Sequence, residues 1–464
     1  MRSGGDAWSR REWLQAGAIG ALGIGLPGLL RNHAQAASRP RPSSLTSFGR
    51  AKSCLLVFMT GGPPQHETFD PKPNAPLEIR GPFRSIPTSI PGIHFSELLP
   101  AIARKAHRVT IIRSMTTDIN SHSSSGHFML TGYPHPAGNA ETPATSDDFP
   151  SLAAMVGALK PSEKVPISSV VLPEAIVNNP NVPWPGQDAG IMGATHNPFL
   201  LRCDPGRFPF VVDGLRLPPA VDELRMTARA GLLEGLDRSF QARVSTSLTR
   251  GFDRVQQQAF DMMRNAGSRA AFELDAEPAS WRDRYGRHKF GQSLLLARRL
   301  IQSGVRLVQV NWPREAGDTS VGNPLWDTHQ KNAERCKDVL CPAFDRSFAT
   351  LLDDLESSGL LDETLVLVMG EFGRSPKINP EGGRDHWGHC FSVVMAGAGT
   401  PSGLVLGSSD REGGYPTARP ILPADLAATV FHRLGISPNA EFPDLLGRQR
   451  MVTNGGAPIP ELLS

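Results

Sequence analysis

The stretch Leu365-Val-Leu-Val-Met369 runs directly into Gly370-Glu-Phe-Gly-Arg374. A short, continuous apolar run beside turn residues is typical of a parallel strand whose two faces are both covered. In open α/β sheets, ligands bind beyond the carboxyl ends of such strands. Three potential metal ligands, Glu371, Asp385 and His386, follow this strand. The sequence therefore predicts that the chemistry lies at this end of a sheet.

The same arrangement recurs at other predicted strands, whose ends carry Asp, Glu, His or Ser. These strands are residues 54–59, 109–112 and 305–310. Two further strands are predicted at 167–172 and 392–396. The segments between them have the apolar periodicity of helices, at 97–106, 291–302, 336–355 and 424–434. Alternating strands and helices predict an α/β fold with a doubly wound, mostly parallel central sheet flanked by helices.

The N-terminus has the features of an export signal. Arg10 and Arg11 precede a weakly apolar, glycine-rich stretch at 16–30, and Ala34-Gln-Ala36 offers a cleavage site. The apolar stretch is shorter than the roughly 20 residues that span a bilayer. We therefore expect residues 1–36 to be a twin-arginine signal peptide, with export by that machinery to the periplasm or the outside and no stable membrane span.

After the signal, residues 37–50 form a flexible lead-in and residues 51–464 a single α/β domain. Residues 219–284 differ in composition, being charged and helical in periodicity. They are expected to form a helical insertion, which either covers one end of the sheet and shapes a substrate cleft or is a solvated helical pair with no such role.

Composition mainly excludes classes of function. The formal net charge is +3, partly from the arginines of the signal, and no basic stripe is interleaved with aromatic residues, so nucleic-acid binding has no support. Five scattered cysteines do not form a disulfide framework. Cys336 and Cys341 are close in sequence, but on a helix they would be poorly placed to bridge, and buried thiols are expected.

Several motifs, in order along nearly the whole mature chain, resemble the bacterial family called domain of unknown function 1501. They are Thr60-Gly-Gly-Pro63, Phe69-Asp-Pro-Lys-Pro73, Arg113-Ser-Met115, Trp326-Asp-Thr-His329, Gly370-Glu-Phe-Gly-Arg374 and Gly383-Arg-Asp-His-Trp387. That family belongs to the alkaline phosphatase and sulfatase superfamily. The resemblance implies a site for two metal ions at the strand ends, used in the superfamily to hydrolyse phosphate and sulfate esters.

The resemblance also implies a set of metal ligands. Two divalent cations neutralise a phosphoryl or sulfuryl group and activate the attacking oxygen, and Asp, Glu and His bind such ions. The ions implied are zinc, calcium, manganese or magnesium. The matching residues are Asp327 and His329 as the first pair, Glu371 as the later acidic ligand, His386 as the final histidine with Asp385 beside it, and Asp70 or Glu67 as the ligand after the first strand.

Each of these residues also has an ordinary interpretation. Asp385 and Arg384 can form a surface ion pair, Glu371 can pair with Arg374, and a single histidine is usually structural. The metal-site hypothesis rests on convergence, because several separate strand ends each carry a residue of a ligand type.

The nucleophile motif of sulfatases is only partly kept. Leu130-Thr-Gly132 matches the end of the motif, and counting back eight residues from Leu130 gives His122 where sulfatases have cysteine. A histidine can bind metal, act as a general base or accept a phosphoryl group. Three alternatives remain open: attack by a hydroxide activated by the metal, no hydrolysis at all, or attack by one of the neighbouring serines, Ser121, Ser123, Ser124 or Ser125.

The predicted function is that of an exported metal-dependent hydrolase of phosphate or sulfate esters, acting on a small molecule or a polysaccharide. The alternative is a non-catalytic binding or scaffold protein that retains the sulfatase-like fold with a degenerate site. Trp184, Trp312, Trp326 and Trp387 flank the motif loops, where they can stack on sugar rings or pack in the core.

Overall fold

The computed structural model describes residues 47–178, 182–212, 225, 228, 231–232, 266–314 and 325–463. The predicted signal peptide, most of the lead-in and most of the predicted insertion at 219–284 lie outside the described residues. Within the described ranges, no helix is both long enough and apolar enough to cross a membrane.

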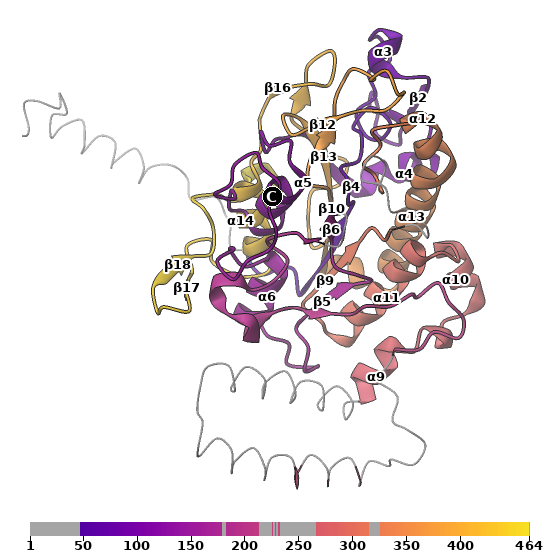
Figure 1. Ribbon diagram of the computed structural model, residues 1–464. Helices are drawn as coiled ribbons and strands as arrows, with labels where there is room; N and C mark the ends of the chain where they lie inside the picture. The colour runs from indigo at the N-terminus through magenta and orange to yellow at the C-terminus, as the bar shows by residue number, and fades with distance from the viewer. Residues whose placement is uncertain are drawn as a thin grey trace, which may run out of the picture. The chain divides into compact units, whose positions relative to one another are not determined.

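An eight-stranded sheet forms the centre of the unit that begins at Ser47 (Figure 1). Its strands, in spatial order, are β14 (Val405–Leu406), β4 (Val109–Met115), β13 (Phe391–Ala396), β10 (Thr364–Met369), β1 (Ser53–Phe58), β9 (Leu307–Asn311), β5 (Ser169–Leu172) and β8 (Phe199–Leu200). Only β13 runs antiparallel to its neighbours, β10 and β4. The predicted mostly parallel sheet is therefore confirmed.

Helices cover both faces of the sheet, as Figure 1 shows. In β1 every residue is buried, and alternate side chains enter two different cores, since Leu55 and Val57 belong to one cluster and Leu56 and Phe58 to the other. The first core includes α4 (Pro100–Arg104), α11 (Lys289–Ser303) and α13 (Cys341–Ser357), and the second includes α5 (His122–Thr131), α6 (Leu152–Leu159) and α14 (Pro423–Arg433). Burial on both faces explains the continuous apolar runs in the sequence.

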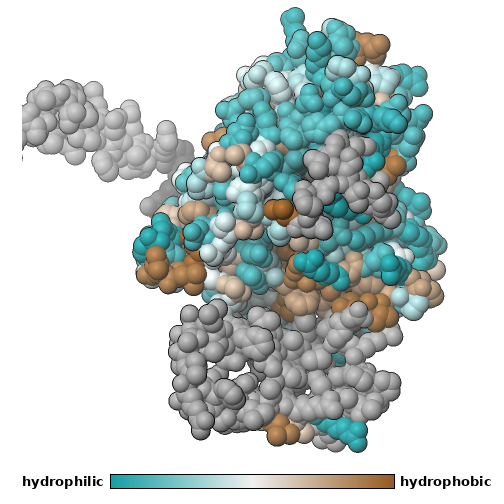
Figure 2. Space-filling model, in the orientation of Figure 1, coloured by the Kyte–Doolittle hydropathy of each residue, from teal (hydrophilic) through white to brown (hydrophobic). Residues whose placement is uncertain are grey.

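The remaining elements are short and lie around this core. They are α3 (Leu77–Arg80), α9 (Ala266–Phe272), α10 (Ala279–Tyr285), α12 (Asn332–Arg335) and the strand pairs β2 (Ser85–Pro87) with β3 (His94–Ser96), β6 (Val177–Asn178) with β7 (Val182–Pro183), β11 (Gly373–Arg374) with β12 (His386–Trp387), β15 (Ser408–Ser409) with β16 (Pro416–Ala418) and β17 (Glu441–Pro443) with β18 (Gln449–Met451). The surface over β12, β16 and α3 is largely hydrophilic, whereas hydrophobic side chains gather at the β17–β18 hairpin (Figure 2), where Leu445 and Leu446 are exposed.

The helix predicted at 336–355 has two parts. A π-helical turn at Cys336–Leu340 comes first, and α13 follows it. Cys336 and Cys341 are fully buried, and both are free thiols. The structure thus has buried thiols at these positions.

Helix α5 is absent from the predicted elements, because its sequence begins with serines and carries glycine, which are weak helix formers. Burial stabilises it instead: all its residues after His122 are buried. A Cβ at Gly126 would lie 2.7 Å from Trp184 Cε3, so the glycine lets Trp184 pack against the helix. This contact fixes the start of α5 beside the carboxyl ends of the strands.

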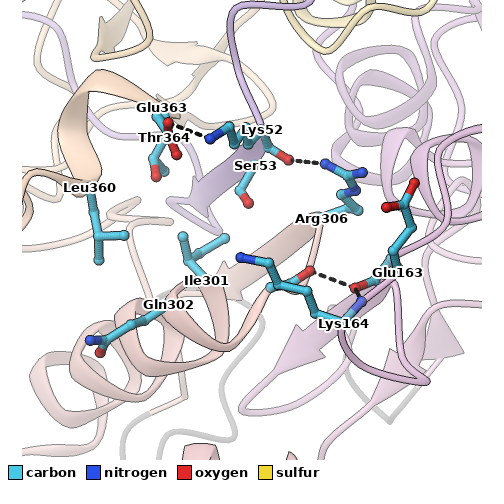
Figure 3. A pocket seen from close by; sticks show the side chains of 12 residues that line it. Lys52, Ser53, Glu163, Lys164, Ile301, Gln302, Arg306, Leu360, Glu363 and Thr364 are labelled. Carbon is cyan, nitrogen blue, oxygen red and sulfur yellow. Dashed lines mark hydrogen bonds and ion pairs between the residues drawn. The ribbon is translucent and has the colours of Figure 1, made fainter. Parts of the chain in front are cut away.

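A cavity of about 360 Å³ lies at the opposite, amino-terminal edge of β1 and β10 (Figure 3). Its charged side chains are largely engaged with the protein. Lys52 Nζ lies 2.5 Å from Glu363 Oε1, and Arg306 Nη1 donates to the Lys52 carbonyl oxygen at 3.0 Å. Among the described residues, no group of potential metal ligands converges at this edge.

Candidate active site

Three connections between elements of the fold bring potential metal ligands together at the carboxyl edge of the sheet. His122 begins α5 after β4, Asp327 and His329 follow β9, and Glu371 follows β10. His386 lies in β12, just before β13, and since β13 runs against the other strands it starts at the edge where they end. The reversed strand therefore explains how His386 reaches the other four residues.

His122 is held between two carboxylates. Its Nδ1 lies 2.7 Å from Glu371 Oε1 and its Nε2 lies 3.1 Å from Asp327 Oδ2. Burial favours the neutral ring, but Asp327 and Glu371 outweigh burial and raise the pKa of His122 to about 9. Without a metal, the side chain is therefore an imidazolium near neutral pH.

Asp327 is the centre of the cluster. Its Oδ1 lies 3.0 Å from His329 Nε2 and 3.0 Å from His386 Nε2. The same oxygen accepts a hydrogen bond from Arg374, whose side chain is fully buried. Burial disfavours the charged carboxylate, yet Arg374 and His122 overcome burial and hold the pKa of Asp327 well below its ordinary value. Asp327 is therefore ionised, as a carboxylate ligand of a metal ion would need to be.

The hydrogen bonds of His386 and His329 leave a lone pair on each Nε2. His386 Nδ1 donates to the carbonyl oxygen of Asn120 at 2.7 Å, and His329 Nδ1 faces Asp385 Oδ1 at 3.2 Å. Burial, together with the charges of His122 and Arg374, lowers the pKa of His386 to about 4, so this ring is neutral. Oxygen partners on Nδ1 are the usual way in which proteins orient histidine ligands.

These donor atoms fit a divalent metal ion. The two Nε2 atoms lie 2.8 Å apart and both approach Asp327 Oδ1, so lone pairs and negative charge converge on one point. Ligand atoms of His122, Asp327 and His386 all lie within 4.8 Å of one another. Imidazole nitrogens combined with a carboxylate oxygen suit zinc and related ions.

Glu371 offers a further unsatisfied oxygen. Its side chain is fully buried, and Oε1 accepts from Gly61 N at 2.9 Å as well as facing His122. Oε2 is buried without a hydrogen-bond partner, as is the nearby hydroxyl of Thr60. Buried polar atoms without partners are rare, and an ion or ligand beside them is one explanation. Gly61 is required here, because a Cβ on it would lie 2.4 Å from Asp327 N.

Aromatic rings hold the imidazoles in place. The His122 ring stacks on Trp184 with centroids 5.5 Å apart, and Phe372 stacks on His386 at 4.7 Å. Trp184 is buried, and its Nε1 donates to Asn178 Oδ1 at 2.6 Å. Trp312 and Trp326 are buried as well. These three tryptophans therefore pack inside the protein, and Trp184 positions the candidate catalytic histidine.

The structure does not bring the two candidates from the first strand into this cluster. Glu67 is buried, and its Oε1 lies 2.7 Å from Arg384 Nη2. Asp70 Oδ1 lies 3.0 Å from Lys72 Nζ. Asp385 touches the site only through His329 Nδ1, and 61% of its side chain is exposed. Asp385 therefore orients a ligand, while Glu67 and Asp70 neutralise basic side chains.

Ser123 and Ser124 turn away from the histidines. Ser123 Oγ accepts from Thr142 N at 2.7 Å, and Ser124 Oγ donates to the carbonyl oxygen of Ala140 at 2.5 Å. Successive helix residues point about 100° apart, so Ser123 and Ser124 point away from the face of α5 that carries His122. Both hydroxyls hold the loop that carries Glu141.

A cavity of about 360 Å³ opens above the cluster. Its walls include the ligand candidates His122, Asp327, His329 and His386, together with Thr60, Glu141, Asn178, Trp184, Arg314 and Leu325. Burial raises the pKa of Glu141, but hydrogen bonds from Ser123 and Asn178, together with the positive charge of His122, outweigh burial and lower this pKa. Glu141 is therefore ionised. The cavity is wide enough for a small ester or the end of a longer chain.

Sequence reasoning missed the role of the buried arginines. The sequence suggested that Arg374 pairs with Glu371, but in the structure it contacts Asp327. It also suggested a surface pair of Arg384 with Asp385, but Arg384 is buried and contacts Glu67. Both arginines sit in glycine-containing loop motifs beside the acidic residues. That proximity was a usable signal, but which carboxylate each arginine contacts depends on the tertiary structure.

The family comparison agrees with the motifs. The matching family is described as "Protein of unknown function (DUF1501)", and the match covers residues 51–463. The chain belongs to this family. No curated protein sequence matches this chain.

Similar solved structures include a protein in the alkaline phosphatase superfamily, a sulfatase and a phosphonate monoester hydrolase. An alkaline phosphatase superfamily protein from Vibrio parahaemolyticus is 11% identical with a TM-score of 0.38, covering 84% of this chain and 68% of its own. A sulfatase from Pseudoalteromonas sp. is 12% identical with a TM-score of 0.38, covering 86% and 72%. A phosphonate monoester hydrolase from Silicibacter pomeroyi is 11% identical with a TM-score of 0.33, covering 89% and 76%. Similarity at this level does not specify an activity for the DUF1501 protein.

Proposed function

We propose that this DUF1501 protein is an exported, metal-dependent hydrolase of phosphate or sulfate esters, acting on a small molecule or a polysaccharide. The main support is the convergence of His329 Nε2 and His386 Nε2 on Asp327 Oδ1, at 3.0 Å each. The Oε2 atom of Glu371 has no hydrogen-bond partner and offers a second carboxylate oxygen to a metal ion beside the same cavity. The Arg10-Arg11 pair in the N-terminal segment supports export.

The residues that would hold the ion are Asp327, His329 and His386, and Glu371, whose Oε2 has no hydrogen-bond partner, would complete its surroundings. A divalent ion bound there supplies positive charge against the developing negative charge of a transferred phosphoryl or sulfuryl group. Arg374 keeps Asp327 ionised, and Asp385 and Asn120 orient the two imidazoles. These contacts fix the orientation of the three side chains.

His122 is assigned to proton transfer. Its ring lies on the cavity wall, and its nitrogens lie within hydrogen-bond distance of two carboxylates, so it can hold a proton there. As water adds to the phosphorus or sulfur atom and the ester bond breaks, a proton delivered from this ring to the leaving oxygen would act as general acid catalysis, which typically contributes about 10² to 10⁴-fold. Ser123 and Ser124 have no part in this scheme, since their hydroxyls contact the loop at 140–142.

A non-catalytic binding or scaffold protein is the second candidate. The observation that favours it is that the hydroxyls of Ser123 and Ser124 are both engaged with the loop at 140–142. Such a protein would bind metal and an anionic ligand without turnover.

The test uses full-length protein recovered folded from the periplasm. We expect elemental analysis to find at least one divalent ion per chain, and expect hydrolysis of aryl phosphate or aryl sulfate esters to stop on chelation and return with the metal. Bound metal without turnover across a broad ester panel would support the binding protein. Absence of both metal and turnover would reject the proposed hydrolase.

A further inference from the structure

A carboxylate of the protein itself occupies the start of helix α5. Glu141 Oε1 accepts a hydrogen bond from His122 N at 2.5 Å, and Oε2 accepts from Ser123 N at 3.1 Å. Asn178 Nδ2 donates to the same Oε2 at 2.8 Å. Backbone N–H groups at a helix N-terminus favour anions, because they lack partners within the helix and the helix dipole is positive there. Glu141 therefore fills an anion-binding position on the wall of the cavity.

A second polar group without a partner belongs to a residue that lines the same cavity. The Thr60 side chain is 3% exposed, its hydroxyl is buried without a hydrogen-bond partner, and the residue lines the same cavity as Glu141 and His122. A buried hydroxyl without a partner costs free energy unless a ligand or water satisfies it. Glu141 alone therefore leaves the polar groups of this cavity incompletely paired.

We propose that a tetrahedral oxyanion, the phosphoryl or sulfuryl group of the substrate, binds at the N–H groups of His122 and Ser123 and at the Thr60 hydroxyl, and that Glu141 is an internal competitor for this position. This inference rests on the proposed function and deepens it, because it locates the reacting group of the ester. Two anions cannot share the same pair of donors, so Glu141 leaves when the oxyanion binds.

The surroundings of Glu141 allow the side chain to move while its loop stays in place. Ser124 Oγ binds the carbonyl oxygen of Ala140, and Thr142 N binds Ser123 Oγ at 2.7 Å, so the loop is attached on both sides of Glu141. Among the described residues, the hydrogen bonds to the Glu141 carboxylate come from His122 N, Ser123 N and Asn178 Nδ2, which are donors that an oxyanion can also use. A rotation of the Glu141 side chain is thus enough to open the position.

The experiment measures the affinity of inorganic phosphate and inorganic sulfate by titration calorimetry, on metal-free and on manganese-loaded full-length protein. Glu141→Gln removes the competing charge, and Glu141→Ala removes the competing group. We expect both variants to bind phosphate about tenfold more tightly than the wild type. In the wild type, the charged Glu141 carboxylate competes for the same donors, and its charge-assisted hydrogen bonds are roughly twice as strong as neutral ones. Glu163→Gln is the matched control, because the exposed Glu163 lines the cavity at the opposite edge and its loss should change the affinity less than about twofold.

A third variant tests the hydroxyl. In the Glu141→Gln background, Thr60→Val keeps the shape of the side chain but removes its hydroxyl. Phosphate binding should weaken about fivefold or more, because one hydrogen-bond donor is lost. Thermal midpoints of all variants check that each is folded. Unchanged or weaker phosphate binding in both Glu141 variants would overturn the inference and make Glu141 a structural cap of α5.

The two proposals fail in different ways. Tighter phosphate binding by the Glu141 variants in a protein that hydrolyses no ester would keep the oxyanion position and reject the hydrolase. Ester hydrolysis by a wild type whose Glu141 variants bind phosphate no better would keep the hydrolase and reject the oxyanion position.

Discussion

His329 Nε2 and His386 Nε2 lie 2.8 Å apart, while the opposite nitrogen of each ring faces an oxygen atom. Two lone pairs held this close repel each other unless a proton or a cation lies between them. The carboxylate of Asp327, 3.0 Å from both atoms, adds negative charge at the same point. Positive charge at this point, from a proton or a divalent cation, would relieve the repulsion, and this is the physical basis on which we propose a metal site.

Removing Asp327 should remove the metal. We expect Asp327→Asn to weaken divalent metal binding by more than about 100-fold, and Asp385→Asn, which only orients His329, to weaken it by about 10 to 100-fold. Calorimetric titration of metal into the apo protein measures both, with the exposed Asp338→Asn as a control that should bind like the wild type. Equal affinity in wild type and Asp327→Asn would refute the proposed ligand.

Replacing His122 should abolish turnover. His122→Ala is expected to lower kcat on aryl esters by about 10² to 10⁴-fold, as for other general acid–base residues. Ser124→Ala, which loses only a contact with the loop at Ala140, should retain activity within about threefold. A phosphoserine trapped in the wild type during turnover would show instead that a serine attacks the substrate.

Glu67 should matter for stability and not for metal content. Glu67→Gln leaves Arg384 buried without its anion, and breaking a buried ion pair from one side costs about 3–5 kcal/mol. Denaturant unfolding measures this loss, and Glu363→Gln, which breaks the exposed pair with Lys52, should cost less than about 1 kcal/mol. A change in metal stoichiometry in Glu67→Gln would return this residue to the list of ligands.

The buried His127 should make the protein less stable in mild acid. Burial and the nearby His135 lower the pKa of His127 to about 4, against an opposing hydrogen bond to the carbonyl oxygen of Tyr133. Because the unfolded chain takes up this proton near pH 6.5 and the folded protein only near pH 4, stability is lost as the pH falls between these values. The loss attributable to His127 reaches about 3 kcal/mol at pH 4.

Comparing unfolding free energies at pH 7 and pH 4 tests this expectation. His127→Gln should lose less stability than the wild type over that range, whereas a substitution at the exposed His94 should leave the wild-type loss unchanged. An equal loss in wild type and His127→Gln would contradict the assignment.

Export should depend on the arginine pair. Replacing Arg10 and Arg11 with lysine is expected to leave the precursor in the cytoplasm, because the twin-arginine machinery reads both side chains. Cell fractionation and the size of the protein on a gel measure this outcome. Normal secretion of the double variant would point to a different route of export.

The sequence alone determined the class of fold and the region of the site. The apolar run at 365–369 predicted a strand buried on both faces, and β10 spans Thr364–Met369 with every residue buried. Asp327, His329, Glu371 and His386 were predicted to meet at the carboxyl edge, and the structure brings their side chains together with His122. Such features are local, since apolar periodicity sets the elements and the sheet edge gathers whatever follows its strands.

Only the tertiary structure decided which partner each charged group has. It pairs Arg374 with Asp327 and Arg384 with Glu67. It also places Glu141 at the start of α5, a helix that the sequence did not predict because serine is a weak helix former. Such pairings join residues far apart in the sequence, and several carboxylates compete for each guanidinium or N–H group. The winner is set by burial and distance after the sheet has formed, because an unpaired buried charge costs more than any local preference can supply.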